Sequence, residues 1–80
     1  MDIKPQHIKD VILFTPKVYS DERGFFLETF RKTVFEKLCI PEFVQHNHSR
    51  SGLGVLRGLH YQTNNVQGKL VRCARGKIYD

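Results

Sequence analysis

A chain of 80 residues with a formal net charge of +5 is long enough for one small domain, which buries only about 60% of the surface that its unfolded form exposes. Its two cysteines, Cys39 and Cys73, allow at most one disulfide, which excludes the disulfide-rich secreted class. The charged N-terminus lacks a signal peptide, and no apolar run approaches the roughly 20 residues that span a bilayer. We therefore expect a cytoplasmic protein with free thiols that does not bind membranes.

The first thirty residues are expected to be mostly β-strand. Alternation of apolar and polar residues predicts strands at residues 11–14, 17–19 and 25–30. Residues 21–24, with the sequence DERG, predict a turn between the last two strands, because the glycine tolerates a positive φ.

One helix is predicted, near residues 31–38. Val34, Phe35 and Leu38 lie at the spacing of an apolar helical stripe. Pro41 follows and is expected to end the helix.

The second half predicts two further pairs of strands. Residues 43–49 and 55–62 flank a glycine-containing turn, and residues 69–74 and 77–79 flank Arg75 and Gly76. Short strands separated by glycine turns indicate an all-β sandwich or barrel. The last alternating segment stops at Asp80 without a turn, from which we expect the chain to be truncated.

All of the excess positive charge lies in the second half. Residues 1–44 carry seven basic and seven acidic side chains, whereas residues 45–80 carry six basic ones against Asp80. This half also holds three of the four histidines. Such an imbalance favours an anionic ligand, and the alternative is a solvated basic face.

Polar side chains with binding potential gather around residues 45–62. In an extended segment Gln45 and Asn47 share one face, where two amides present donors and acceptors to a base or a sugar. Surface polarity is the alternative interpretation of this pair. Arg23 and Glu28, near the first turn, are equally compatible with an ordinary surface ion pair.

His60 is the candidate general base, because the pKa of an imidazole lies near neutral pH. Arg57 and Lys69 would supply positive charge beside it, Lys69 at a developing oxyanion. Strict alternation places Arg57 and His60 on opposite faces, so their convergence requires a bulge at Gly58. The alternative for His60 is a histidine packed in a core.

Other functional classes are less well supported. The His46-x-His48 spacing suits a metal site, and a metal-binding cupin that uses His46, His48 and His60 is a further hypothesis. No third ligand is evident, however, and we expect no metal. The basic residues do not alternate with aromatic residues in a stacking pattern, so nucleic-acid binding is not expected.

Four segments together are similar to a known family: DERGFFLETF (residues 21–30), FVQHNHSRS (43–51), GVLRGLHYQ (54–62) and KLVRCARGKIYD (69–80). In this order they resemble the dTDP-4-dehydrorhamnose 3,5-epimerases. The resemblance implies a cupin-type jelly roll, a double-stranded β-helix of which residues 1–80 would form the N-terminal part. It also implies a homodimer without metal or organic cofactor.

The resemblance further implies the reaction and the residue roles. An isomerase of dTDP-rhamnose biosynthesis, the route to lipopolysaccharide O-antigen, would epimerise a dTDP-linked 4-keto-6-deoxy sugar at C3 and C5. His60 would be the base and Lys69 would stabilise the enolate. The expected substrate-binding residues are Arg23, Glu28, Gln45, Asn47 and Arg57.

Two departures from the family pattern affect these expectations. Many members carry aspartate where His46 stands. The tyrosine that acts as general acid and the aspartate that orients the base would lie beyond Asp80. An inactive fragment that binds at most a nucleotide-sugar or a partner subunit is therefore the alternative function.

Overall fold

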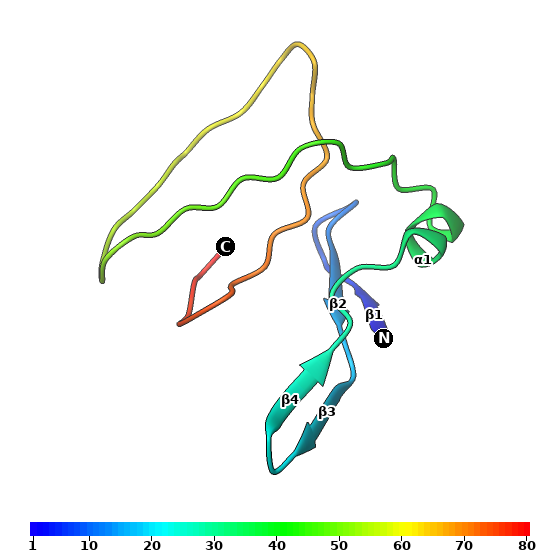
Figure 1. Ribbon diagram of the computed structural model, residues 1–80. Coiled ribbons are helices and arrows are strands. Elements are labelled where there is room, and N and C mark those ends of the chain that lie inside the picture. Colours follow the sequence, from blue (N-terminus) through cyan, green and yellow to red (C-terminus); the bar gives the residue numbers. More distant parts are fainter.

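The computed structural model of the protein describes all of residues 1–80 and contains four short strands followed by one helix (Figure 1). The elements are β1 (Asp2–Pro5), β2 (Ile12–Thr15), β3 (Val18–Asp21), β4 (Gly24–Leu27) and α1 (Lys32–Lys37). The prediction of a mainly β chain with a single short helix is confirmed for the first half of the chain, where all five elements lie.

The strands form two separate antiparallel pairs. β1 pairs with β2 from Asp2 opposite Thr15 to Pro5 opposite Ile12. β3 pairs with β4 from Val18 opposite Leu27 to Asp21 opposite Gly24. β1 was not predicted, because Ile3 is its only apolar β-forming residue and a single residue gives no alternation.

The β3–β4 hairpin extends away from the other strands (Figure 1). The predicted turn is confirmed: Glu22 and Arg23 connect the two strands, and Gly24 has a φ of +130°. L-residues rarely adopt this backbone conformation, so glycine is required at that position. Phe25 and Phe26 are 73% and 71% exposed on this hairpin.

The packed part of the molecule is an aromatic cluster around Phe35, which is only 3% exposed and is the one buried residue. The ring centroid of Phe35 lies 4.8 Å from that of Phe14, 5.0 Å from that of Phe30 and 6.0 Å from that of Phe43. These separations are those of favourable aromatic pairs. The cluster joins α1 to β2 and to the segments on either side of the helix.

The helix ends at Lys37, one residue before the predicted end, and Leu38 is its C-cap. Cys39 takes a left-handed conformation with φ of +58°. Its N–H donates to the carbonyl of Glu36, and the N–H of Ile40 donates to the carbonyl of Phe35, both at 3.0 Å. This pair of bonds is the Schellman arrangement, which satisfies carbonyls that the helix leaves free.

Glycine is the usual residue at this left-handed position, because a Cβ atom strains it. Cys39→Gly is therefore expected to raise the free energy of unfolding by about 0.5–1 kcal/mol. Urea unfolding followed by circular dichroism would measure the change. A matched Cys73→Gly variant, whose backbone has no positive φ, should not be stabilised. Loss of stability in Cys39→Gly would contradict the strain argument.

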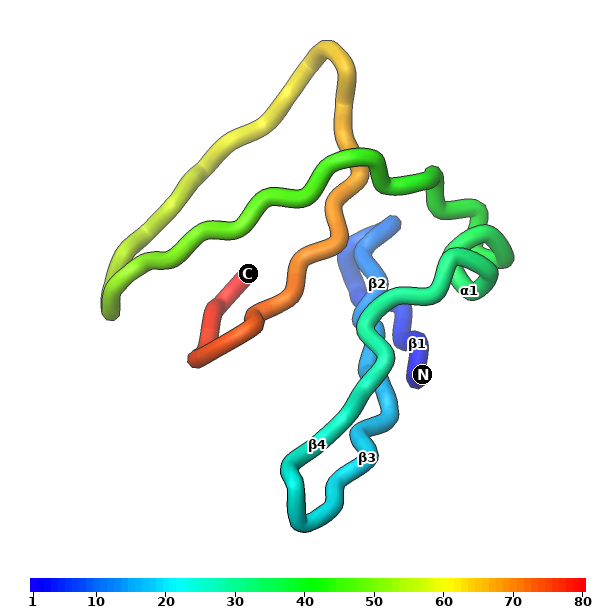
Figure 2. The backbone as a smooth tube through the Cα atoms, viewed as in Figure 1, coloured from blue at the N-terminus to red at the C-terminus, as the bar shows by residue number.

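Residues 43–80 form an open loop that extends away from the strands and the helix (Figure 2). The strands expected at residues 43–49, 55–62, 69–74 and 77–79 do not form, so those four predictions are wrong for this structure. The whole chain has 18 backbone hydrogen bonds, and its radius of gyration is 14.9 Å, against about 12 Å for a compact domain of this length.

The four expected strands of the second half do not form because they lack pairing partners. A strand is stable only when neighbouring strands accept its N–H groups and cover its apolar side chains. Leu53, Leu56, Leu59 and Val66 are at least 76% exposed, so nothing within residues 1–80 covers this segment.

Candidate functional site

Arg23 lies in the turn at the tip of the β3–β4 hairpin, where it pairs with Asp21. Its Nε and Nη2 donate to Oδ2 of Asp21 at 3.1 and 2.7 Å, and its backbone N–H donates to Oδ1 at 2.8 Å. The side-chain bonds from Arg23, followed by the backbone bond, hold the pKa of Asp21 below its ordinary value of 3.8. The carboxylate is therefore charged at neutral pH, and its contact with Arg23 is lost only as the pH falls through this lowered pKa.

Glu28 lies just after β4 and pairs with the residue before the helix. Nη2 of Arg31 donates to Oε2 of Glu28 at 2.8 Å. The hydrogen bond and the charge of Glu28 raise the pKa of Arg31 further above its ordinary value. Both side chains are largely exposed, so this pair contributes little to stability but fixes the position of the Glu28 carboxylate.

Gln45 and Asn47 lie side by side, as the alternating pattern predicted. Nε2 of Gln45 donates to Oδ1 of Asn47 at 3.2 Å. The contact forms although residues 43–49 are not paired in a sheet, because an extended backbone places side chains i and i+2 on the same side. The carbonyl oxygen of Gln45 and the NH2 group of Asn47 take no part in this bond and remain free to bind a ligand.

Arg57 is held by the preceding turn. Its Nε donates to the hydroxyl of Ser51, and its Nη2 donates to the backbone carbonyl of Arg50 at 3.1 Å. Gly58 follows with a φ of +141°, a backbone conformation that favours glycine. No strand pairs with this segment, so the bulge at Gly58 stays a prediction.

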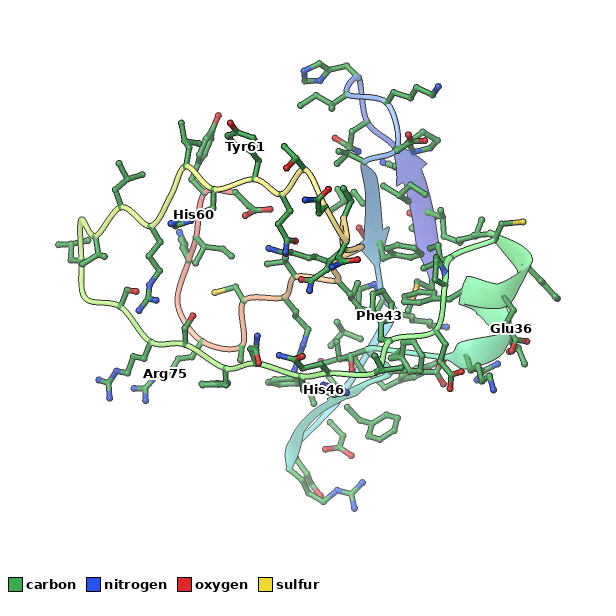
Figure 3. All side chains as sticks on the ribbon, turned by 90° about the horizontal axis from the view of Figure 1, so that it is seen from above. Glu36, Phe43, His46, His60, Tyr61 and Arg75 are labelled. Carbon is green, nitrogen blue, oxygen red and sulfur yellow. The ribbon has the colours of Figure 1, made fainter.

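His60 and Lys69 are exposed and have no hydrogen bond or ion pair in the structure. The side chains of His60 and Tyr61 project to opposite sides of the extended backbone (Figure 3). No hydrogen bond joins Arg57, His60 and Lys69 to one another. Their convergence in one cavity therefore stays a prediction, which depends on the pairing of the segments that carry them.

A pocket lies elsewhere, beside α1. It has a volume of about 300 Å³ and is lined by the aromatic rings of Phe30, Phe35 and Phe43 and by the charged side chains of Lys32, Glu36 and Glu42, among others. None of the predicted site residues lines it.

Metal-ligating side chains do not gather in the structure. No group of three histidine, cysteine, aspartate or glutamate side chains lies close enough to hold an ion, so His46, His48 and His60 are not brought together. None of the helical structure is long and apolar enough to cross a membrane.

Asp21, Arg31 and Ser51 are polar partners that the sequence interpretation missed. The signal for Asp21 was present, because an aspartate at the first position of a turn commonly accepts a bond from the backbone two residues later. No comparable local signal identifies Ser51, which is six residues from Arg57.

Comparisons with known proteins agree over the whole chain. The sequence profile of the family described as dTDP-4-dehydrorhamnose 3,5-epimerase matches residues 5–80. Curated proteins of that name are similar to the chain: 56% identity over 91% of it in Pseudomonas aeruginosa, 54% over all of it in Shigella flexneri, and 56% over all of it in Neisseria gonorrhoeae. The chain spans 41%, 46% and 25% of those three proteins. No solved structure matches it.

Proposed function

The chain belongs to the dTDP-4-dehydrorhamnose 3,5-epimerase family, and from this membership we propose that it carries part of the machinery for epimerising a dTDP-linked 4-keto-6-deoxy sugar at C3 and C5. The observation that carries the proposal is the match over residues 5–80. The identity of at least 54% in the three relatives named above is far greater than a shared fold alone would require.

The proposed chemistry is proton transfer next to a ketone. The imidazole of His60 takes the proton from the carbon beside the carbonyl, and the C–H electron pair moves into an enolate whose negative oxygen faces the ammonium group of Lys69. Return of a proton to the opposite face inverts the carbon and restores the ketone. The six basic side chains of residues 45–80 support this role, because they favour an anionic substrate.

Substrate binding is assigned to five further residues. Arg57 would hold the sugar end beside the base. Gln45 and Asn47 would line the nucleotide-sugar site with the carbonyl oxygen of Gln45 and the NH2 group of Asn47, which take no part in the bond between them. Arg23 and Glu28 would bind the nucleotide end. The ion pairs that hold Arg23 and Glu28 support these roles, since each fixes a charged group beside the β3–β4 hairpin.

We further propose that residues 1–80 form the N-terminal part of a single cupin-type jelly-roll domain, working as a cytoplasmic homodimer without metal or organic cofactor. The two antiparallel strand pairs are compatible with such a domain. The uncovered apolar residues of the second half support it as well, because strands from elsewhere in a larger domain would bury them.

A second candidate is an inactive fragment that binds at most a nucleotide-sugar or a partner subunit. Two observations favour it for the isolated chain. The chain spans less than half of the relatives it matches, and the segment carrying His60 has no packed surroundings.

Exchange of substrate C–H protons with deuterated water separates the two candidates. A full-length polypeptide containing this sequence is expected to catalyse exchange. The isolated 80-residue chain should be slower by on the order of 10⁴-fold, because an imidazole without an orienting carboxylate loses tautomer control. Mass spectrometry of the recovered sugar nucleotide measures both rates. Equal rates would exclude the inactive-fragment hypothesis, and absence of exchange by the full-length polypeptide would exclude the epimerase.

A further inference from the structure

The Arg23 guanidinium is held on one edge only. A guanidinium has five N–H donors, and two of them, on Nε and Nη2, point to a single oxygen of Asp21. The two donors on Nη1 and the second donor on Nη2 have no partner. One donor on Nη1 and the second donor on Nη2 lie parallel along the outer edge of the planar group, and the other Nη1 donor points to its remaining side.

This unpartnered edge faces solvent. The Arg23 side chain is 86% exposed and the Asp21 side chain is 50% exposed. The other oxygen of Asp21 accepts the backbone N–H of Arg23 at 2.8 Å, so one carboxylate fixes both the backbone and the side chain of the same residue. The backbone and one edge of the guanidinium of Arg23 are thus restrained, and the remaining N–H donors are accessible to a ligand.

We propose that Asp21 is a positioning residue, which holds the Arg23 guanidinium so that its free edge receives the diphosphate oxygens of the nucleotide. The inference rests on the proposed function, in which Arg23 binds the nucleotide end. A planar guanidinium binds two phosphate oxygens through parallel N–H bonds. An arginine already restrained by Asp21 loses less rotamer freedom on binding than a free one does.

An argument from charge alone predicts the opposite effect of removing Asp21 on diphosphate binding. If Asp21 acted only through its negative charge, it would repel the diphosphate, and its removal would tighten binding. Glu22 provides the matched control, because it is the adjacent acidic residue in the same turn and makes no hydrogen bond or ion pair in the structure. Removing each charge separately therefore distinguishes positioning from repulsion.

The experiment measures the Kd of dTDP by calorimetry on the full-length polypeptide. Asp21→Ala is expected to raise the Kd by about 3–10-fold. Asp21→Asn should raise it by a similar factor, since its amide oxygen can still accept the backbone N–H but its NH2 group cannot accept the guanidinium donors. Glu22→Gln should lower the Kd or change it by less than about 2-fold. With the dTDP-sugar substrate, Asp21→Ala should raise KM and leave kcat unchanged.

A double-mutant cycle separates positioning from general stabilisation of the hairpin. In an Arg23→Ala background, Asp21→Ala should have no further effect on the Kd. If it still weakens binding there, Asp21 acts through the fold and the positioning role is overturned. Unchanged or tighter binding by the Asp21 variants, with Arg23→Ala weakened, also overturns it while the proposed function stands. Failure of the unmodified polypeptide to bind dTDP overturns both.

Discussion

His60→Ala in the full-length polypeptide should lower the rate of substrate proton exchange by about 10²–10⁴-fold, the range that a positioned general base contributes. Alanine leaves no group within reach of the proton beside the ketone, so only solvent can remove it. Incorporation of deuterium at C3 and C5 of the sugar, followed by NMR, measures the loss at each position separately. The Kd of dTDP should change little, because the imidazole is assigned to the sugar and not to the nucleotide.

His48→Ala is the matched control for this experiment. His48 is also an exposed histidine of the second half, without a resolved contact and without an assigned role. We expect it to retain at least about half of the exchange rate, within the range of ordinary surface substitutions. Exchange that persists at the unmodified rate in His60→Ala would remove His60 from the role of base.

Phe35→Ala should have the largest effect on stability, lowering the free energy of unfolding by about 3–5 kcal/mol. Phe35 is 3% exposed, and its ring contacts those of Phe14, Phe30 and Phe43. Removing the ring leaves a cavity where three others met, and it detaches α1 from β2. Near-ultraviolet circular dichroism of the aromatic side chains during urea unfolding reports the loss directly.

Phe25→Ala serves as the control, since it removes the same side chain from a position that is 73% exposed. Its effect should stay below about 1 kcal/mol, because little of the ring leaves water when this part of the chain folds. Equal destabilisation by the two variants would show that the cluster around Phe35 is not the stabilising centre of the structure.

Local patterns were sufficient to predict the helix and the β3–β4 hairpin. Val34, Phe35 and Leu38 define one face of α1, and the helix is bounded by Arg31 and Leu38 as expected. The turn at the hairpin tip followed from Gly24, whose positive φ is available to few other residues. Each of these features depends on residues within a few positions of one another.

The second half could not be predicted in this way. Alternation around Val55 and Leu56 is typical of strands, yet alternation states only which side chains share a face and not which segment covers them. Phe43 was expected to begin a strand, and it packs against Phe30 and Phe35 instead. An apolar contact formed locally there, whereas the expected strand required a partner.

At the candidate site, too, only contacts between residues close in sequence could be predicted. The contact of Gln45 with Asn47 followed from the two-residue repeat of an extended chain. The partner of Arg57 was not foreseeable, because Ser51 is one of several nearby hydroxyl groups. The meeting of Arg57, His60 and Lys69 depends on strand pairing over long sequence separations, which short-range patterns do not specify.

The two strand pairs have a consequence for the order in which the molecule assembles. Each strand pairs only with its neighbour in sequence, and the widest pairing joins Asp2 to Thr15. Contacts of such low order close small loops, which cost little chain entropy and form within microseconds. During synthesis on the ribosome, the two strand pairs of residues 2–27 can therefore form before residues 43–80 have left the ribosome.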